Sequence, residues 1–490
     1  TIRADISPVM DIELVLGGGP SKNGSSEDDT PGGGTDPAEG STMRPLVRDI
    51  PLETLQRDGT RYTLPIARSG IPDPLPHAAR ALRLRLTASE RGVTILDTAI
   101  DIELREARRY FPETSAPNTR FGTPTLIWRD RLITGSASGE DAVVRLHDMS
   151  GRFAMGRLAP INYTNTQSFG HAMTTGMLDG EPILAIGDPI NSEKAFSAGA
   201  FWIYSLRTGD WIRTGFMPGA ATEDNFGESL DLSDGFAVIG ASQDLFQGRR
   251  SGSVTLFNIR KGLGLRKLAP LMRQEGEQFG TSVAMNDTYI AVGAPEREIE
   301  TDDGAGRTRG GAVFLFERGT GKQAGIVSLA GSIFDPEDGD GFGRTIAIGE
   351  DILAVGAPGY DSGAFNAGSV FIVDLDTLDV TRGIESPDPV REGGFGRSLS
   401  VRGSRLLVGE PGGEDSEGFP GRAHLFDITR EGLMRSFGPT PGRAGDLFGE
   451  SVFLDETLAA IGAPGDDTRG RNTGTVHVFD LEARPGSLPE

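Results

Sequence analysis

The 490-residue sequence has no cysteine and no run of 18 apolar residues. The first absence excludes disulfide bonds, thiolate metal sites and cysteine nucleophiles. The second predicts no transmembrane segment, because a spanning helix needs such a run. Hydrophobic residues make up only 37%, while glycine accounts for 70 positions, about twice the usual share of roughly 7%. Few apolar residues and many glycines predict an all-β protein rich in turns.

Positive charge is also scarce. The 48 lysine and arginine residues face 70 aspartate and glutamate residues, which gives a net charge of −22. Such an acidic surface repels phosphate backbones and anionic lipid heads, so we expect neither nucleic acid nor simple electrostatic membrane binding. The chain begins at Thr1 and not at methionine. We therefore expect a processed N-terminus and a secreted or cell-surface protein.

The first hundred residues differ from the rest. Residues 1–16 alternate polar and apolar side chains like a short strand, whereas residues 17–42 consist mainly of glycine, serine, aspartate and proline. A segment of that composition cannot bury enough surface to offset its chain entropy, which predicts a flexible linker. Alternation returns in residues 43–100 and predicts a small β-region. We expect the repeats described next to occupy residues 101–483, and a short tail to follow at 484–490.

Seven Phe-Gly pairs follow one another with spacings of 48, 57, 53, 63, 53 and 53 residues. Periods of this size are typical of propellers, in which a four-stranded blade needs about 40–50 residues. The seven pairs begin at Phe121, Phe169, Phe226, Phe279, Phe342, Phe395 and Phe448.

Three other marks keep phase with Phe-Gly. An apolar strand ends in a glycine turn, as in AIGDP, VIGAS, AVGAP and LVGEP, and a small residue then opens a further strand, as in GAVFLFER and GSVFIVDL. A proline usually precedes the next Phe-Gly by eight or nine residues; Pro336 departs from this rule because it lies six residues before Phe342. Each repeat thus supplies four strands, for example SVAMN, YIAVG, AVFLFE and IVSLA.

These recurring residues suit scaffold roles. A phenylalanine ring buries a large apolar area at one point and can act as a wedge between blades. The glycine after it permits a positive φ or a close backbone approach, and the second glycine lets the chain leave its strand sharply. None of these residues can act as an acid, a base or a nucleophile.

The marks resemble the FG-GAP repeats of integrin-α-type propellers, over about residues 103–483. The resemblance implies a seven-bladed β-propeller used mainly in protein recognition and adhesion. The last repeat has no fourth strand after GTVHVFDL. We expect the segment near residues 103–111 to supply it and to close the ring, because closure removes two exposed sheet edges.

Metal and cofactor chemistry has little support in the sequence. The family's spaced triple of calcium ligands is absent between Phe-Gly and the second glycine, so no calcium site can be transferred. The turn DPEDGDG offers Asp335, Asp338 and Asp340 as weak candidates for a hard cation; a solvated turn is the simpler interpretation, as it is for the acidic stretch from Glu296 to Asp303. No cofactor is predicted.

The histidines do not form a catalytic set. His424 and His477 fall where other repeats have Phe314, Phe371, Trp202 and Thr255, which favours a packing role for both. We therefore predict no catalytic residues and expect a protein that is not an enzyme.

The leading functional hypothesis is a non-catalytic extracellular or cell-surface propeller for protein recognition or adhesion. One alternative is a structural subunit of a surface filament or layer, assembled into a homopolymer by exchange of the strand in residues 1–16. An enzyme with a site on the loops of the propeller is a further alternative. The expected partner is another protein or copies of the chain itself.

Overall fold

The computed structural model describes the strands between residues 9 and 103 and most of the chain beyond residue 107. The described residues after 107 are 108–112, 118–136, 142–149, 156–160, 168–300, 306–413, 416, 418–430, 432–439 and 442–481. The predicted linker, residues 17–42, and the predicted tail, residues 484–490, lie outside them. The chain forms two compact units, one of residues 1–106 with 482–490 and one of residues 107–481.

The first unit contains a four-stranded sheet in the order β2-β1-β5-β6. Strand β1 pairs antiparallel with β2 on one side and with β5 on the other, so both of its edges are used within the chain. A short hairpin, β3–β4, belongs to the same unit. The strands are β1 (Val9–Leu16), β2 (Arg44–Pro51), β3 (Gln56–Asp58), β4 (Arg61–Thr63), β5 (Ala81–Glu90) and β6 (Val93–Glu103).

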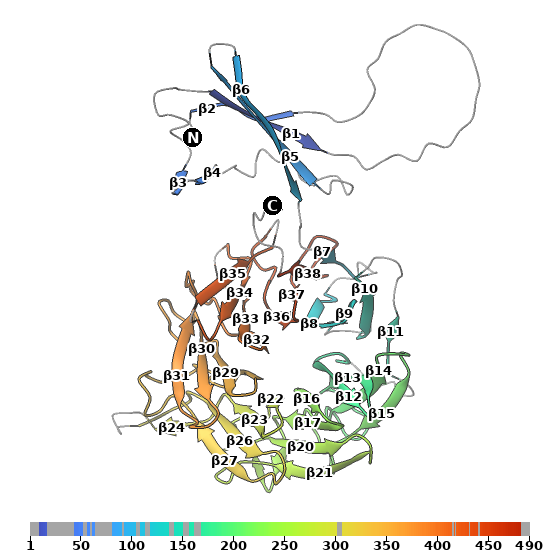
Figure 1. The fold of residues 1–490 in the computed structure, drawn as a ribbon. Helices are drawn as coiled ribbons and strands as arrows, with labels where there is room; N and C mark the ends of the chain where they lie inside the picture. The colour runs from blue at the N-terminus through green and yellow to red at the C-terminus, as the bar shows by residue number, and fades with distance from the viewer. Residues whose placement is uncertain are drawn as a thin grey trace, which may run out of the picture. The chain divides into compact units, whose positions relative to one another are not determined.

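The second unit is a ring of seven four-stranded antiparallel sheets (Figure 1). We number these blades 1–7 in chain order. Blade 1 contains β8 (Phe121–Trp128), β9 (Arg131–Ser136), β10 (Val144–Asp148) and β11 (Arg157–Leu158). Blade 2 contains β12 (Met173–Leu178), β13 (Glu181–Asp188), β14 (Ala200–Ser205) and β15 (Trp211–Gly215). Blade 3 contains β16 (Leu230–Ser233), β17 (Phe236–Ala241), β20 (Ser253–Asn258) and β21 (Leu263–Leu268).

The remaining blades repeat this plan. Blade 4 contains β22 (Ser282–Met285), β23 (Tyr289–Ala294), β26 (Ala312–Glu317) and β27 (Gln323–Val327). Blade 5 contains β28 (Thr345–Ile348), β29 (Ile352–Ala357), β30 (Ser369–Asp374) and β31 (Val380–Glu385). Blade 6 contains β32 (Ser398–Arg402), β33 (Arg405–Glu410), β34 (Arg422–Asp427) and β35 (Gly432–Phe437). Blade 7 contains β36 (Ser451–Leu454), β37 (Leu458–Ala463), β38 (Thr475–Asp480) and β7 (Arg108–Tyr110).

The ring closes as the sequence predicts. Strand β7, from the start of the unit, pairs with β38 of the last repeat, with Val476 opposite Tyr110 and Val478 opposite Arg108. Two small hairpins extend from the loops: β18 (Leu245–Phe246) with β19 (Arg249–Arg250), and β24 (Ile299–Glu300) with β25 (Arg307–Thr308). The predicted fold class, an all-β seven-bladed propeller closed by an N-terminal strand, is confirmed, and no helix occurs among the described residues.

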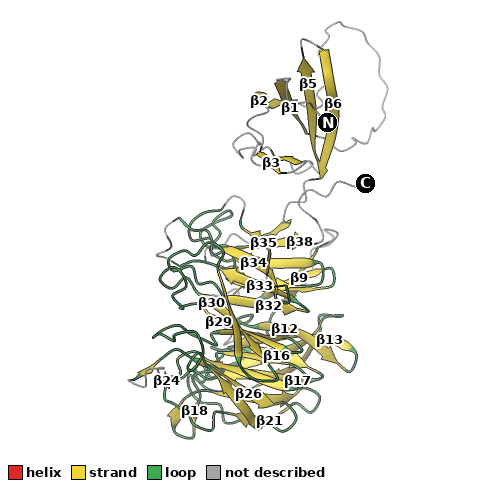
Figure 2. Ribbon diagram, turned by 60° about the vertical axis from the view of Figure 1, so that its left-hand side comes forward, coloured by secondary structure: helices red, strands yellow, loops and turns green. Residues whose placement is uncertain are grey.

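Burial explains the strand patterns. The second and third strands of each blade are sandwiched between neighbouring blades, so runs such as Ala312–Phe316 are buried on both faces. Fourth strands lie at the circumference and alternate exposed and half-buried positions, as in β27. Figure 2 shows the blades from another direction, with the loops projecting beyond the strand ends. Seven apolar clusters form the core, and each combines residues of two adjacent blades.

Candidate protein-binding surface

The seven phenylalanines of the Phe-Gly pairs lie at the boundaries between blades, and each has a fully buried side chain. Phe169 packs edge-on against Trp202, with 5.4 Å between ring centroids, and Phe279 packs in the same way against Phe314. Each glycine that follows has a φ between 89° and 101°, in the region that favours glycine. The Phe-Gly residues that mark the repeat therefore serve the packing of the scaffold.

Glycine is required at the second glycine position of each repeat for a different reason from the one that the sequence suggested. A Cβ at Gly240 would collide with the carbonyl oxygen of Gly280, the Phe-Gly glycine of the next blade. The same close approach recurs at all seven blade boundaries. Close contact between neighbouring blades, and not a sharp exit from the strand, thus requires glycine here.

A hydroxyl group joins the blades at five of these boundaries. The serine or threonine two residues after the Phe-Gly glycine donates a hydrogen bond to the Phe-Gly carbonyl of the following blade, at 2.6–2.7 Å. The donors are Ser229, Ser282, Thr345, Ser398 and Ser451. Blades 1 and 2 carry Pro124 and Ala172 at this position. Sequence reasoning missed this contact, although FGES, FGTS, FGRT and FGRS show the hydroxyl residue in phase.

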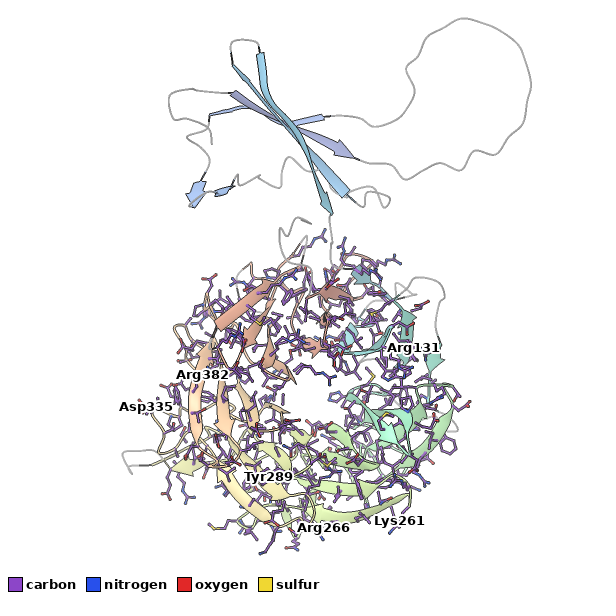
Figure 3. All side chains as sticks on the ribbon, viewed as in Figure 1. Arg131, Lys261, Arg266, Tyr289, Asp335 and Arg382 are labelled. Carbon is purple, nitrogen blue, oxygen red and sulfur yellow. The ribbon has the colours of Figure 1, made fainter. Side chains whose placement is uncertain are left out.

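Arginines form a second set of contacts between neighbouring blades. Arg382 of β31 donates to the Ile428 carbonyl of the next blade at 3.1 Å, and Arg435 of β35 donates to the Asp480 carbonyl at 3.0 Å. Arg131 donates to the Leu206 carbonyl between blades 1 and 2 at 2.6 Å. Arg131 and Arg382 are labelled in Figure 3.

Buried acids brace the loops that lead into Phe-Gly. In four blades the residue two positions before the phenylalanine is a buried acid that accepts a hydrogen bond from the backbone N–H three residues earlier, at 2.5–3.0 Å. These acids are Asp224, Glu277, Asp340 and Asp446. Arg297 neutralises Glu277 in a buried ion pair. Because most of these carboxylates are held by their own loops, they are structural groups and not exposed ligands.

Blade 6 places its acid differently. It has Gly393 at the loop position, and the buried Glu410 extends from β33 towards it, so that a Cβ on Gly393 would lie 3.0 Å from Glu410 Oε1. Glu410 Oε2 contacts His424 Nε2 at 2.9 Å and accepts a hydrogen bond from Ser386 at 3.0 Å. His424 Nδ1 lies 3.0 Å from the Ser436 hydroxyl. His424 is buried in the strand position that Phe314 occupies in blade 4.

The three weak candidates for cation binding do not share an arrangement. Asp335 is exposed at the circumference (Figure 3). Asp338 forms a bidentate ion pair with Arg309, at 3.0 and 2.9 Å, which lowers the pKa of its carboxyl group. Asp340 is buried, and desolvation raises its pKa to about 7. Among the described residues, no group of three or more histidine, cysteine, aspartate or glutamate side chains could hold a metal ion.

The acidic stretch 296–303 and His477, which the sequence also singled out, contact neighbouring scaffold residues where they are described. Of the acidic stretch 296–303, Glu296 contacts Arg309 at 3.8 Å, and residues 301–303 lie outside the described residues. His477 is buried, and its pKa is lowered to about 4, mainly by desolvation. His477 packs edge-on against Phe448 with 5.2 Å between ring centroids.

Exposed aromatic and arginine side chains gather on the loops that connect second to third strands and fourth strands to the next blade. We call this the loop face. These loops interlock: the N–H of Glu392 donates to the Phe365 carbonyl at 2.9 Å. The Arg391 guanidinium lies over the Phe365 ring, 4.8 Å from its centroid, and Phe365 is 49% exposed. Phe196, on the corresponding loop of blade 2, is 66% exposed.

An open pocket of about 840 Å³ lies on the loop face at blade 6. The guanidinium of Arg422 covers the Phe419 ring at 4.7 Å and bonds to the Asp388 carboxylate at 3.0 Å. Aromatic and arginine side chains are enriched where proteins bind one another. The pocket is lined by Val390, Arg391, Ser416, Gly418, Phe419, Pro420 and Arg422.

The fold defines a β-propeller built from sequence repeats. A family model described as "FG-GAP repeat" matches residues 218–257, 266–316, 334–373 and 438–479, in blades 3, 4, 5 and 7. Four of the blades thus match the FG-GAP repeat, and the propeller has seven blades. A comparison with curated proteins gave no match. Within the described residues, no helix has the length and apolar character needed to cross a membrane.

Proposed function

We propose that this protein is a non-catalytic recognition module that binds another protein through the loop face of its propeller, outside the cell or at its surface. The observation that carries the proposal is the pairing of Arg391 with the exposed Phe365 beside the pocket at Phe419. The repeat marks are buried in the scaffold, so the loops are left to determine what is bound. FG-GAP propellers generally serve recognition, which supports the same assignment.

The test compares capture of surface proteins by three forms of the full chain. Phe365→Ala with Phe196→Ala removes two exposed aromatic side chains from the loop face. Leu433→Ala with Met434→Ala is the matched control, since both residues are exposed on the outer strand β35. We expect the wild type and the control to retain one crosslinked partner, and the loop-face variant to lose it. Equal capture by all three forms, or measurable turnover of a substrate, contradicts the proposal.

Exchange of strand β1 between copies is a second candidate, for a structural subunit of a filament. Strand β1 is central in its sheet, and 27 residues separate its end at Leu16 from the start of β2 at Arg44. A central strand on a long connection can be donated to a neighbour without loss of pairing. Deletion of residues 1–42 should then dissolve the assembly, as measured by analytical ultracentrifugation. An unchanged mass would reject the exchange.

A further inference from the structure

One stretch of the chain reverses the charge of the protein. Residues 245–274 hold seven of the 48 lysine and arginine residues and none of the 70 aspartate and glutamate residues, so the rest of the chain carries a net charge of −29. The stretch includes β20, β21 and the loops around them in blade 3. Arg260 and Lys267 form ion pairs with Asp179 and Asp244. Within the described residues, the other five cations form none: Arg249, Arg250, Lys261, Arg266 and Arg273.

The outer strand of blade 3 and the turn before it present two of these charges, Lys261 and Arg266, beside exposed apolar side chains. Strand β21 is the last strand of its sheet, so it has an unpaired edge among the described residues. Lys261 and Arg266 are exposed there and lie at the circumference (Figure 3). Leu263 and Leu265, between them, are 46% and 45% exposed. The exposed cations and leucines together allow this edge to bind an acidic partner. The cations also oppose unspecific pairing of the edge with other strands.

Blade 5 has the opposite character. Residues 335–392 contain 13 acidic residues and three basic ones, a net charge of −10. Its outer strand β31 is likewise the last strand of a sheet, and Asp376, Asp379 and Glu385 are exposed on it or on the turn before it. None of the three forms an ion pair with another described residue. Ile333, on the loop leading into this blade, is 89% exposed.

We propose that the outer edge of blade 3 binds the outer edge of blade 5 in a second copy of this chain. Each molecule carries both edges on different blades, so occupation of one leaves the other free. Such a contact is heterologous, and repetition builds a ring or an open filament. Charge complementarity sets the register and rejects like-charged edges. The net charge of −22 opposes the approach of two copies only weakly at physiological salt, where the screening length is about 8 Å.

The four residues substituted in the test lie on β21, or on the turns that lead into β21 and β31, and not on the loops of the loop face or on β1. The inference therefore stands or fails independently of both proposals above. The variant Lys261→Glu with Arg266→Glu reverses the basic edge, and Asp376→Lys with Asp379→Lys reverses the acidic edge. Arg207→Glu with Arg430→Glu is the matched control. It changes the net charge as the first variant does, also at exposed residues, in blades 2 and 6.

Sedimentation velocity of the full chain at 50 mM and 500 mM NaCl gives the readout. We expect the wild type and the control to form species larger than a dimer at low salt and to dissociate at high salt. Each edge variant alone should weaken association about tenfold or more. An equimolar mixture of the two edge variants should associate again, because the reversed edges complement each other, and this also shows that both are folded.

Three results overturn the proposal. The first is a wild type that stays monomeric at both salt concentrations. The second is a basic-edge variant that associates like the wild type, and the third is a control that dissociates as the edge variants do. Flotation with vesicles of phosphatidylcholine and phosphatidylserine tests the other reading of a basic, apolar edge. Binding by a monomeric wild type, lost in the basic-edge variant, would assign the edge to anionic membranes and reject self-association.

Discussion

The hydroxyl group of Ser451 donates a hydrogen bond of 2.6 Å to the carbonyl oxygen of Gly122, 329 residues earlier in the chain, and so joins blade 7 to blade 1. The same contact recurs at four other boundaries. Blade 2 lacks it, because Ala172 occupies the donor position. The ring is thus held at each boundary by a buried phenylalanine and, at five of them, by a hydroxyl group as well.

Removal of one such hydroxyl should weaken the ring measurably. We expect Ser398→Ala to lower the free energy of unfolding by about 0.5–1.5 kcal/mol, since an intramolecular hydrogen bond is lost and the Gly449 carbonyl keeps no replacement. Conversely, Ala172→Ser should raise the stability slightly by supplying the missing donor to Gly227. Urea unfolding followed by fluorescence measures both changes. Stabilities identical to the wild type in both variants would show that the hydroxyl contacts add nothing to blade packing.

The buried ion pair of Glu277 and Arg297 should be intolerant of single substitutions. Arg297→Met leaves Glu277 as an uncompensated buried charge and is expected to cost about 3–5 kcal/mol. The double variant Glu277→Leu with Arg297→Met removes both charges and should recover most of that loss. Guanidinium denaturation of the wild type, both single variants and the double variant gives the coupling free energy. Strictly additive effects would contradict the pairing.

The sequence predicts the fold well because every repeat meets the same physical demand. A phenylalanine that is needed at each blade boundary recurs with a period that can be read directly, and the closing strand follows from the missing fourth strand of the last repeat. Contacts that differ between blades are not periodic and escape this reasoning. Glu410, for example, provides from β33 the acid that blade 6 lacks at Gly393.

Candidate sites are harder to predict, because they depend on which loops meet. Asp338 and Asp340 are close in sequence, yet Asp338 forms an ion pair with Arg309 whereas Asp340 is buried. The charge contrast between blades 3 and 5 was visible in the sequence, but its significance depends on both edges lying at the circumference. The net charge of −22 does not reveal this contrast, because it is the sum over the whole chain and not the charge of the surface that a partner meets.

Three acids should make the propeller more stable in mild acid than in mild alkali. Desolvation raises the pKa of Asp231 to about 6, of Asp340 to about 7 and of Asp446 to about 6. The folded state binds these protons more tightly than the unfolded state, whose carboxyl pKa values are near 3.9. Their contribution to stability is therefore complete below about pH 4 and is lost as the pH rises through 6 to 7.

Calorimetry at constant ionic strength between pH 5 and pH 8 measures this dependence as a falling Tm. Asp340→Asn removes the group with the highest of the three pKa values and should make the fall shallower. Asp376→Asn, which changes the net charge equally at an exposed position, should leave the slope as it is in the wild type. If both variants keep the wild-type slope, Asp340 is not the titrating group.

The closing strand β7 offers a test of the ring itself. A chain of residues 107–481 keeps the pairing of Tyr110 with Val476, whereas a chain of residues 112–481 leaves an edge of β38 unpaired. We expect the longer form to remain soluble, with the unfolding transition of the propeller unchanged. The shorter form should unfold at lower temperature and aggregate, because an exposed edge strand readily pairs with another chain. Differential scanning fluorimetry and size-exclusion chromatography distinguish the two forms. If both behave alike, the ring is stable without its N-terminal strand, and the buried phenylalanines and hydroxyl contacts alone are sufficient to hold blade 7 against blade 1.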